Sequence, residues 1–331
     1  MRVAVIGAGA VGGTIAALLA RGGHTVELTA RGQHLAAIRE HGLYLSGAWG
    51  SHTATIDATP QLIRAPELAF VTTKAQDAEA AILENAALLS GVPVVIVQNG
   101  LRAIETAERA LPRSDIVGGL ALFAASYLSP GRIEVTTAGQ TYLGSTASNS
   151  TLAILYASDV LGAVMPVAAT TNFVGAQWTK LVVNQINAVP AITGLSVQDV
   201  ICRRALRQVI TESMREAVRV GVAGDVRFAR LQGLSDGLLR LFARLPESIG
   251  QLLPLVMKWR MGATPNPGST LQSIRRGQLT EIDYLNGAIV EAGERLGVPT
   301  PVNRALTALV HEVERTGVFA VPEAVGQITG H

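Results

Sequence analysis

The sequence predicts an α/β protein with a doubly wound parallel sheet in its N-terminal half and an all-helical C-terminal domain. Short apolar runs alternate with longer helical patterns over the first 170 residues, and strand-like patterns nearly vanish beyond that point. The length of 331 residues also fits two domains of about 100–200 residues each. We therefore expect one domain at residues 1–170 and a second at residues 171–331.

Four apolar runs in the first half have the length and polar boundaries of strands covered on both faces. They are Arg2–Ile6, Thr25–Leu28, Leu68–Thr72 and Pro93–Val97. Helical patterns follow them at Val11–Arg21, Gln33–Glu40, Asp77–Leu89 and Ala103–Leu111. This alternation implies parallel strands joined by right-handed crossovers. Short strands over residues 116–145, separated by Pro-Gly and Ala-Gly, predict antiparallel additions at the sheet edge.

Helical patterns fill the second half. They cover Gln177–Val189, Asp199–Val220, Asp225–Arg244, Ile249–Met261, Gly277–Leu296 and Asn303–Arg315. Pro301 and Asn303 stand where the last helix begins, and both residue types are common helix-start signals.

Composition excludes several classes of protein. The 27 Lys and Arg nearly balance the 25 Asp and Glu, and no block of like charge predicts a nucleic-acid or membrane-surface partner. Asp159 and Pro166 interrupt the most apolar stretch, so no run of about 18 apolar residues exists. The single cysteine, Cys202, fits a reducing compartment, and we expect a cytoplasmic protein. The six histidines, at positions 24, 34, 41, 52, 311 and 331, lack ligand spacing, so no metal is expected.

The strongest local motif is Gly7-Ala8-Gly9-Ala10-Val11-Gly12, which follows the first strand and opens a helix. In a Rossmann-type domain the first glycine makes the tight turn, the second admits a pyrophosphate, and the third lets helix and strand pack closely. The helix N-terminus adds unpaired N–H donors. We therefore expect a dinucleotide here, bound by Gly7, Gly9, Ala10, Val11 and Gly12; a tight packing turn is the structural alternative.

The residue types at the other strand ends favour NADP. The second strand ends in Leu-Thr-Ala and then Arg31, where an NAD site usually has a carboxylate. A guanidinium suits a 2′-phosphate, although Arg31 could also be a solvated surface residue. Lys74 and Asn99 follow two further strands, so with Arg31 they would line one cofactor groove.

In the second half, polar side chains on apolar helices mark candidate catalytic residues. Lys180 and Asn184 are four residues apart and share one helix face. A buried ammonium costs free energy unless it is paired or faces a cleft, whereas a lysine that reaches solvent is the ordinary alternative. Ser269 and Glu281 lie downstream, and Glu281 could simply complement the dipole of a helix start.

These motifs together resemble the ketopantoate reductase (2-dehydropantoate 2-reductase) family over nearly the whole chain. The motifs that occur in order are the glycine loop, Lys74, Gln98-Asn99-Gly100, Lys180 with Asn184, Ser269, and Glu281 in TEIDYLNG. The resemblance implies that Arg31 and Lys74 bind the phosphate and ribose side of NADP. It also implies that Asn99 lies near the nicotinamide and the substrate.

For catalysis, the resemblance implies that Lys180 is the general acid and that Glu281 supports this lysine and the substrate hydroxyl. Asn184 and Ser269 would bind polar groups of the substrate. The implied activity is NADPH-dependent reduction of a 2-oxo acid, namely ketopantoate to pantoate in pantothenate and coenzyme A biosynthesis. The expected partner is this small molecule, without nucleic acid or membrane, and a homodimer stays open.

Two features depart from the family pattern. The family often has a second Asn four residues after the first, followed by Pro, whereas this chain has Ala188, with Asn187 one residue earlier and Pro190 two later. One residue turns an α-helical side chain by about 100°, so Asn187 replaces that Asn only with a local change. The stretch Val226–Pro267 is also long and is expected to reshape the lid of the pocket.

Three alternatives remain at this point. A reductase of another 2-oxo acid, or an opine- or imine-forming dehydrogenase, would have the same architecture. A non-catalytic NADP(H)-binding sensor is an alternative of a different class. The joint presence of Lys180, Asn184 and Glu281 argues against the sensor, because a sensor needs no proton donor.

Overall fold

The computed structural model describes residues 1–146, 150–262 and 264–329. The chain divides into two compact units, Met1–Phe173 and Val174–His331. The division falls close to the boundary expected after residue 170, at the start of helix α6 (Phe173–Asn184).

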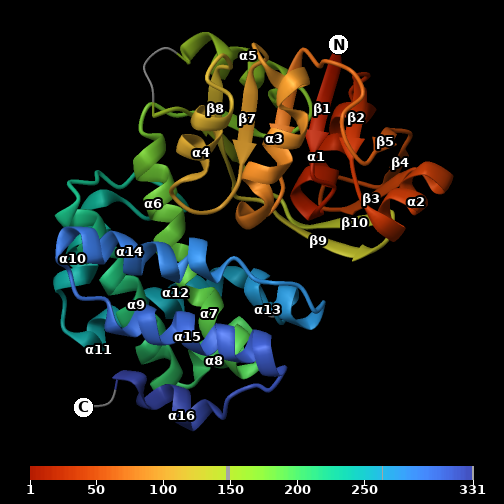
Figure 1. Ribbon diagram of the computed structural model, residues 1–331. Helices are drawn as coiled ribbons and strands as arrows, with labels where there is room; N and C mark the ends of the chain where they lie inside the picture. Colours follow the sequence, from red (N-terminus) through yellow and green to blue (C-terminus); the bar gives the residue numbers. More distant parts are fainter. Residues whose placement is uncertain (147–149, 263, 330–331) are drawn as a thin grey trace. The chain divides into compact units, whose positions relative to one another are not determined.

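The N-terminal unit is built on an eight-stranded sheet (Figure 1). Six parallel strands lie side by side in the order β5-β2-β1-β6-β7-β8. Their bounds are β1 (Arg2–Ile6), β2 (Thr25–Thr29), β5 (Asp57–Thr59), β6 (Leu68–Val71), β7 (Val94–Val97) and β8 (Ile116–Ala121). The strand order reverses at β1, the position where doubly wound sheets open a crevice for ligands at the carboxyl ends of their strands.

Helices cover both faces of this sheet. Helices α1 (Ala10–Arg21) and α5 (Thr151–Gly162) share one hydrophobic core with β1 and β2. Helices α3 (Ala78–Leu89) and α4 (Ala103–Ala110) pack against each other on the opposite face (Figure 1). Helix α2 (Gly32–His41) follows β2 and packs beside β5. The predicted doubly wound architecture is therefore confirmed.

The expectation of antiparallel edge strands over residues 116–145 is wrong in part. Strand β8 continues the parallel sheet, and only β11 (Thr141–Gly144) pairs with it antiparallel, followed by β12 (Val167–Ala169). Strands β9 (Ala124–Ser129) and β10 (Arg132–Thr137) instead join β3 (Leu43–Gly47) and β4 (His52–Ala54) in a separate four-stranded sheet. The sequence analysis predicted neither β3, β4 nor β5.

Burial explains the second sheet. Ile133 and Val135 of β10 are at most 1% exposed, as are Leu43 and Leu45 of β3. These side chains belong to the core that includes α1, because an added Cβ on Gly13 would overlap Ile133. The apolar side chains of β10 thus cover α1 rather than extend the edge of the main sheet.

The second unit is helical in its described residues. After α6 come α7 (Ala188–Thr193), α8 (Val197–Cys202), α9 (Arg204–Ala223), α10 (Asp236–Arg244), α11 (Glu247–Gly250) and α12 (Leu252–Met261). They are followed by α13 (Gly268–Arg275), α14 (Asn286–Leu296), α15 (Pro301–Thr316) and α16 (Pro322–Gly326). Figure 1 shows them from green to dark blue. The predicted all-helical character of the domain is confirmed.

Two of the predicted helices are wrong at their N-terminal ends. The helix expected at Asp225–Arg244 begins only at Asp236, because Asp225, Gln232 and Gly233 have positive φ angles that no α-helix contains. The helix expected at Gly277–Leu296 begins at Asn286, and α13 precedes it unpredicted.

Two further predicted helices are interrupted. The one at Asp199–Val220 is divided at Arg203, and the one at Gln177–Val189 contains a 3₁₀ turn at Gln185–Asn187.

A buried polar network fixes this 3₁₀ turn. Ser213 of α9 donates to Gln185 at 3.1 Å, and Ser213 also contacts Asn303 of α15. The Glu216 carboxylate accepts the backbone N–H groups of Val302 and Asn303 at 2.9 Å and the Asn303 side-chain amide at 2.7 Å. Glu216 therefore satisfies donors at the start of α15, where a helix leaves its N–H groups unpaired.

We expect Glu216→Ala to lower the free energy of unfolding by about 2 kcal/mol or more, because each buried donor left without an acceptor costs about 1–3 kcal/mol. Glu216→Gln keeps one acceptor oxygen and should lose less. Urea unfolding of both variants measures the difference. An equal midpoint for Glu216→Ala and the wild type would contradict the role of this carboxylate.

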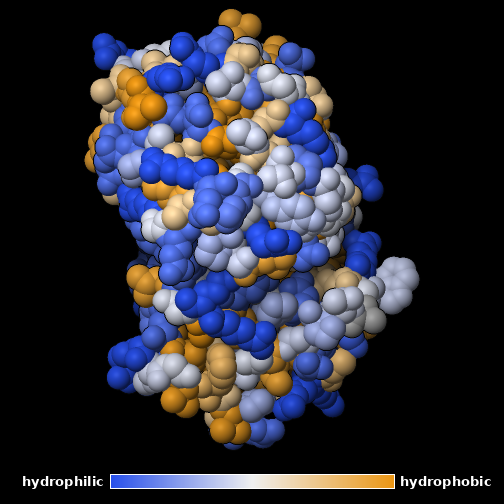
Figure 2. Space-filling model, turned by 90° about the vertical axis from the view of Figure 1, so that its right-hand side faces the viewer, coloured by the Kyte–Doolittle hydropathy of each residue, from blue (hydrophilic) through white to orange (hydrophobic). Residues whose placement is uncertain are grey.

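The surface carries no sign of a large apolar face on the side drawn in Figure 2, where hydrophobic residues form small, separate patches among hydrophilic ones. Across the described ranges, none of the helices is both long and apolar enough to cross a membrane.

Candidate active site

The glycine loop joins β1 to α1, and its three glycines differ in why glycine is needed. Gly7 has a φ of +104°, and an added Cβ on Gly12 would overlap the Gly7 carbonyl and the Thr72 side chain. Gly9, in contrast, has a φ of −66° and nothing within 4 Å of an added Cβ. The fold therefore requires glycine at positions 7 and 12, while position 9 borders open space at the helix N-terminus.

The other two loop residues predicted to bind the cofactor, Ala10 and Val11, come immediately after Gly9 in the chain. Ala10 and Val11 are the first residues of α1 and are half-buried. Their backbone N–H groups belong to the first turn, where they have no carbonyl four residues earlier within the helix. This arrangement suits a phosphate group.

Three more predicted cofactor residues lie at the carboxyl ends of strands in the same unit. Arg31 follows β2, and its guanidinium contacts the Glu84 carboxylate of α3 at 2.9 Å. Lys74 follows β6, immediately before a 3₁₀ turn, and is half-buried. Asn99 follows β7, and the neighbouring Gln98 donates to the Thr73 carbonyl at 2.8 Å. This last hydrogen bond ties two strand ends together.

In the helical unit, Lys180 and Glu281 interact electrostatically. Lys180 lies on α6 among buried neighbours, and burial lowers its pKa to about 8, while the negative charge of Glu281 counteracts part of this fall. A lysine with a pKa near neutrality can both hold a proton and release it at physiological pH. A lysine with this pKa beside a carboxylate can therefore exchange a proton near neutral pH.

The neighbour of Lys180 anchors the long stretch that follows α9. Thr179 is fully buried, and its hydroxyl lies 2.8 Å from the carbonyl oxygens of Gly175 and Ala229. Phe228 packs where a side chain on Gly221 would stand. The residues just after Val226 thus pack on α6 and α9. Whether the stretch to Pro267 covers a substrate stays a prediction.

Asn184 ends α6, and the 3₁₀ turn that follows changes which residues share its face. In a 3₁₀ helix, side chains three residues apart are aligned. The 3₁₀ pitch between Asn184 and Asn187 is therefore a local change of the kind that Asn187 requires; whether Asn187 binds substrate stays a prediction. Ala188 is only 1% exposed and belongs to the core. Asn187 is not among the site residues predicted from the sequence, although its spacing of three from Asn184 was the available signal.

Asn187 also adjoins the segment of the predicted substrate residue Ser269. Gly268 has a φ of +73°, which favours glycine, and an added Cβ would come within 2.6 Å of the Asn187 Oδ1 atom. Ser269 is the second residue of α13 and is exposed. The helical unit thus brings Asn187 beside the start of α13.

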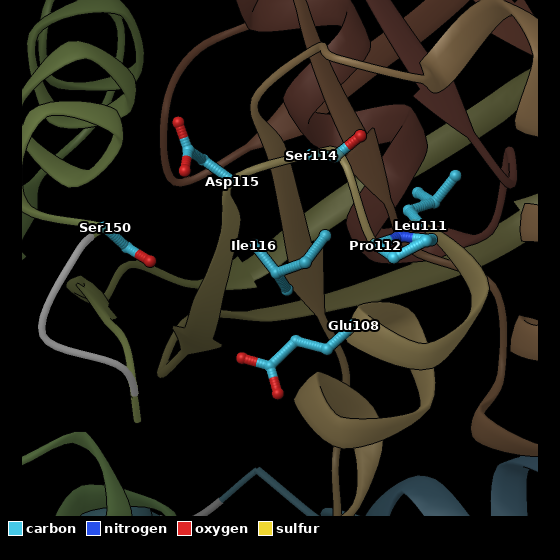
Figure 3. Close-up of a pocket in the computed structure, with 7 residues that line it drawn as sticks. All are labelled: Glu108, Leu111, Pro112, Ser114, Asp115, Ile116 and Ser150. Carbon is cyan, nitrogen blue, oxygen red and sulfur yellow. The ribbon is translucent and has the colours of Figure 1, made fainter.

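A cavity of about 210 Å³ in the N-terminal unit lies elsewhere (Figure 3). Its lining includes Ser114, Asp115 and Ile116 at the amino end of β8, with Ser150 across from them. The predicted cofactor residues lie at the carboxyl ends of the parallel strands, which is the opposite edge. We therefore do not assign this cavity to the cofactor.

No cluster of three or more His, Cys, Asp or Glu side chains able to hold a metal ion occurs among residues 1–146, 150–262 and 264–329. His331 lies outside the described residues.

The fold and its residues define a class before any relative is considered: a two-domain α/β protein with a dinucleotide-type glycine loop and a helical unit in which burial lowers the pKa of a lysine. Comparison with known proteins gives the family. The family "Ketopantoate reductase PanE/ApbA" matches residues 3–148, and its C-terminal counterpart matches residues 172–314. The chain belongs to the ketopantoate reductase family and is an oxidoreductase that acts on CH–OH groups.

Individual relatives match over almost the full length. A 2-dehydropantoate 2-reductase of Archaeoglobus fulgidus is 30% identical, with 95% of this chain and 98% of the relative covered. One from Pyrococcus horikoshii is 26% identical, with 96% and 99% covered.

Solved structures agree on the fold. The PanE/ApbA family ketopantoate reductase from Ralstonia eutropha has a TM-score of 0.79 at 29% identity, with 95% of this chain and 99% of that chain covered. A D-mandelate dehydrogenase solved with NADH and anilino(oxo)acetate reaches a TM-score of 0.82 at 21% identity, with 96% and 99% covered. At that identity the likeness concerns the fold alone.

Proposed function

We propose that this protein reduces a 2-oxo acid with NADPH, and that its substrate is ketopantoate, converted to pantoate for pantothenate and coenzyme A synthesis in the cytoplasm. The observation that carries the proposal is the Lys180–Glu281 pair, since a lysine with a pKa of about 8 is suited to donate a proton to a developing alkoxide. The names of the relatives support the choice of substrate.

The N-terminal unit fits a dinucleotide. No other residue lies within 4 Å of an added Cβ on Gly9, so a ligand has room there. The first turn of α1 offers N–H donors to it. Arg31, Lys74 and Asn99 are the further cofactor residues of this proposal. A nicotinamide bound there would supply the hydride that adds to the C2 carbonyl carbon of the substrate.

In the proposed mechanism, Lys180 acts on the substrate oxygen. Its ammonium stabilises the negative charge that develops when the carbonyl is reduced, and then donates its proton to give the hydroxyl. Glu281 keeps the ammonium charged and accepts a hydrogen bond from the hydroxyl. Asn184, Ser269 and Asn187 would bind the polar groups of the substrate.

The direct test is NADPH oxidation with ketopantoate, 2-oxoisovalerate, pyruvate and phenylglyoxylate, each with and without an amine. We expect ketopantoate to give the highest kcat/KM and the amine to have no effect. A better aryl or amine-dependent substrate would replace the proposed substrate with a related one. Tight NADPH binding without turnover of any substrate would favour the sensor.

Cofactor preference should depend on Arg31 and on its partner Glu84. A charge-assisted contact to phosphate is worth about 1.5–3 kcal/mol, so Arg31→Ala should reduce the NADPH preference about tenfold or more. Glu84→Gln should raise the preference for NADPH, because the Glu84 carboxylate, 2.9 Å from the Arg31 guanidinium, competes with a phosphate for it. Kd values for NADPH and NADH measure both effects.

Arg64→Ala is the matched control for Arg31→Ala. Arg64 is also exposed but lines a small cavity with Arg2 and Thr25 at the amino ends of the strands. Arg64→Ala should leave the preference for NADPH over NADH unchanged. Equal affinities of the wild type for NADPH and NADH would contradict the NADP assignment.

A further inference from the structure

The segment that carries Glu281 is tied to α15 on both sides of that residue. His311 of α15 has its Nε2 atom 2.8 Å from Asp283 Oδ1 and its Nδ1 atom 2.8 Å from Glu314 Oε2. The other Glu314 oxygen accepts the backbone N–H of Thr280 at 2.7 Å. The residue before Glu281 and the residue two after it are therefore both held by one cluster, which we call the α15 clamp (His311, Glu314, Thr280 and Asp283).

The α15 clamp is complete only when His311 is charged. Ionised carboxylates accept hydrogen bonds and donate none, and a neutral imidazole has a single N–H. Neutral His311 can therefore donate to Asp283 or to Glu314, whereas the imidazolium donates to both. Burial alone would lower the pKa of His311, but the two carboxylates outweigh it and raise the pKa above 6.5.

Other charged groups packed against α15 have different partners. Glu294 of α14 contacts Arg304 at 2.6 Å, and Glu216 of α9 accepts the N–H groups of Val302 and Asn303. The groups that act on His311 are Asp283, from the 3₁₀ turn Ile282–Tyr284, and Glu314 on α15 itself.

We propose that His311 is a positioning residue for Glu281: its imidazolium fixes the segment 280–283 so that the Glu281 carboxylate keeps Lys180 protonated. Glu281 itself makes the proposed contact with the ammonium, and His311 acts only through the backbone that carries it. The effect on turnover rests on the proposed function, whereas the clamp itself does not.

The direction of the pH effect follows from the raised pKa. The clamp contributes its full stability below pH 6.5 and loses it as the pH rises through the pKa of folded His311. Once His311 is neutral, it can donate to only one of Asp283 and Glu314, so the segment 280–283 is held less firmly and Glu281 supports Lys180 less well. Lys180 should then lose its proton at a lower pH.

Hydrogen exchange tests the clamp without any substrate. After correction for intrinsic rates, the Thr280 amide of the wild type should exchange faster above the pKa of His311 than below it. In His311→Gln it should exchange fast at every pH, and in His311→Lys, which keeps a cation, it should stay protected. His41→Gln, at an exposed histidine beside Glu40 on α2, is the control. Equal protection in the wild type and His311→Gln would overturn the clamp.

The pH profile of kcat/KM for 2-oxo acid reduction tests the link to Lys180. The wild-type profile should fall above about pH 8, and this limb should lie about half a unit or more lower in His311→Gln than in His311→Lys, whose cation persists over this pH range. NADPH affinity should not change. If the high-pH limb of the kcat/KM profile is the same in all three proteins although the Thr280 amide loses its protection in His311→Gln, the positioning role is wrong. If the wild type reduces no 2-oxo acid, the proposed function fails, and the exchange experiment still decides the clamp.

Discussion

Replacing Lys180 with Ala should lower kcat at least 100-fold, because general-acid assistance is typically worth about 10²–10⁴-fold. NADPH affinity should stay close to that of the wild type, because the proposed cofactor contacts lie in the N-terminal unit. The wild-type rate should also fall above about pH 8, where Lys180 loses the proton it has to donate. Single-turnover and steady-state kinetics with a binding measurement check all three expectations.

Lys258→Ala is the matched control, since Lys258 also lies on a helix of the same unit and contacts Cys202 at 2.9 Å. It should keep nearly the full rate. Glu281→Gln should reduce the rate less than Lys180→Ala, because its proposed task is to keep the ammonium charged. A change in kcat of less than about threefold for Lys180→Ala would refute the mechanism, since a tenfold effect requires only about 1.4 kcal/mol of barrier.

Gly9→Val should abolish the binding of both NADPH and NADH while the protein stays folded. Nothing lies within 4 Å of an added Cβ at this position, and its φ of −66° is open to any residue, so the side chain would fill only the space proposed for the pyrophosphate. Cofactor titration followed by fluorescence, together with thermal unfolding, measures the two properties separately.

Gly237→Val serves as the control for Gly9→Val. Gly237 is exposed near the start of α10, and an added Cβ there also meets nothing within 4 Å. This variant should bind both cofactors normally. Unchanged NADPH affinity in folded Gly9→Val would show that the loop is only a packing turn. Gly12→Val, in contrast, is expected to unfold the unit, because its side chain would overlap the backbone of Gly7.

The regular part of the fold was predictable because continuous apolar runs and glycine positions report strands and turns directly. Strands β1, β2, β6 and β7 lie within a residue of their predicted bounds. The second sheet was not predicted, because its strand β4 has only three residues and because the pattern of β9 and β10 fits an edge of the main sheet equally well. Strand β5, at the edge of the main sheet, also has only three residues and carries too little pattern. The helix predicted at Asp225–Arg244 begins too early, because apolar spacing does not reveal the positive φ angles of Asp225 and Gln232.

Some features of the candidate site could likewise be predicted from the sequence, and others could not. Residue type and order led to Lys180 and Glu281, and the structure shows that they interact electrostatically. The contacts of His311 with Asp283 and Glu314 could not be predicted, because they depend on how α15 packs against the turn that follows α13. The sequence shows Arg31 as an isolated cation, because its pairing with Glu84 depends on the tertiary fold that brings α3 within reach of the residue after β2.

The 3₁₀ turn at Gln185–Asn187 has a consequence for how relatives of this chain are compared. A shift between α-helical and 3₁₀ pitch lets a side chain one position earlier in the chain take a similar direction, because each 3₁₀ residue turns the backbone by about 120° rather than about 100°. An alignment column at position 188 would record the loss of an amide. Under the proposed function, in which Asn187 binds a polar group of the substrate, a spatial comparison would instead record that the amide is retained. Under that proposal, classification of substrate preference by single alignment columns would separate proteins whose substrate-binding amides are alike.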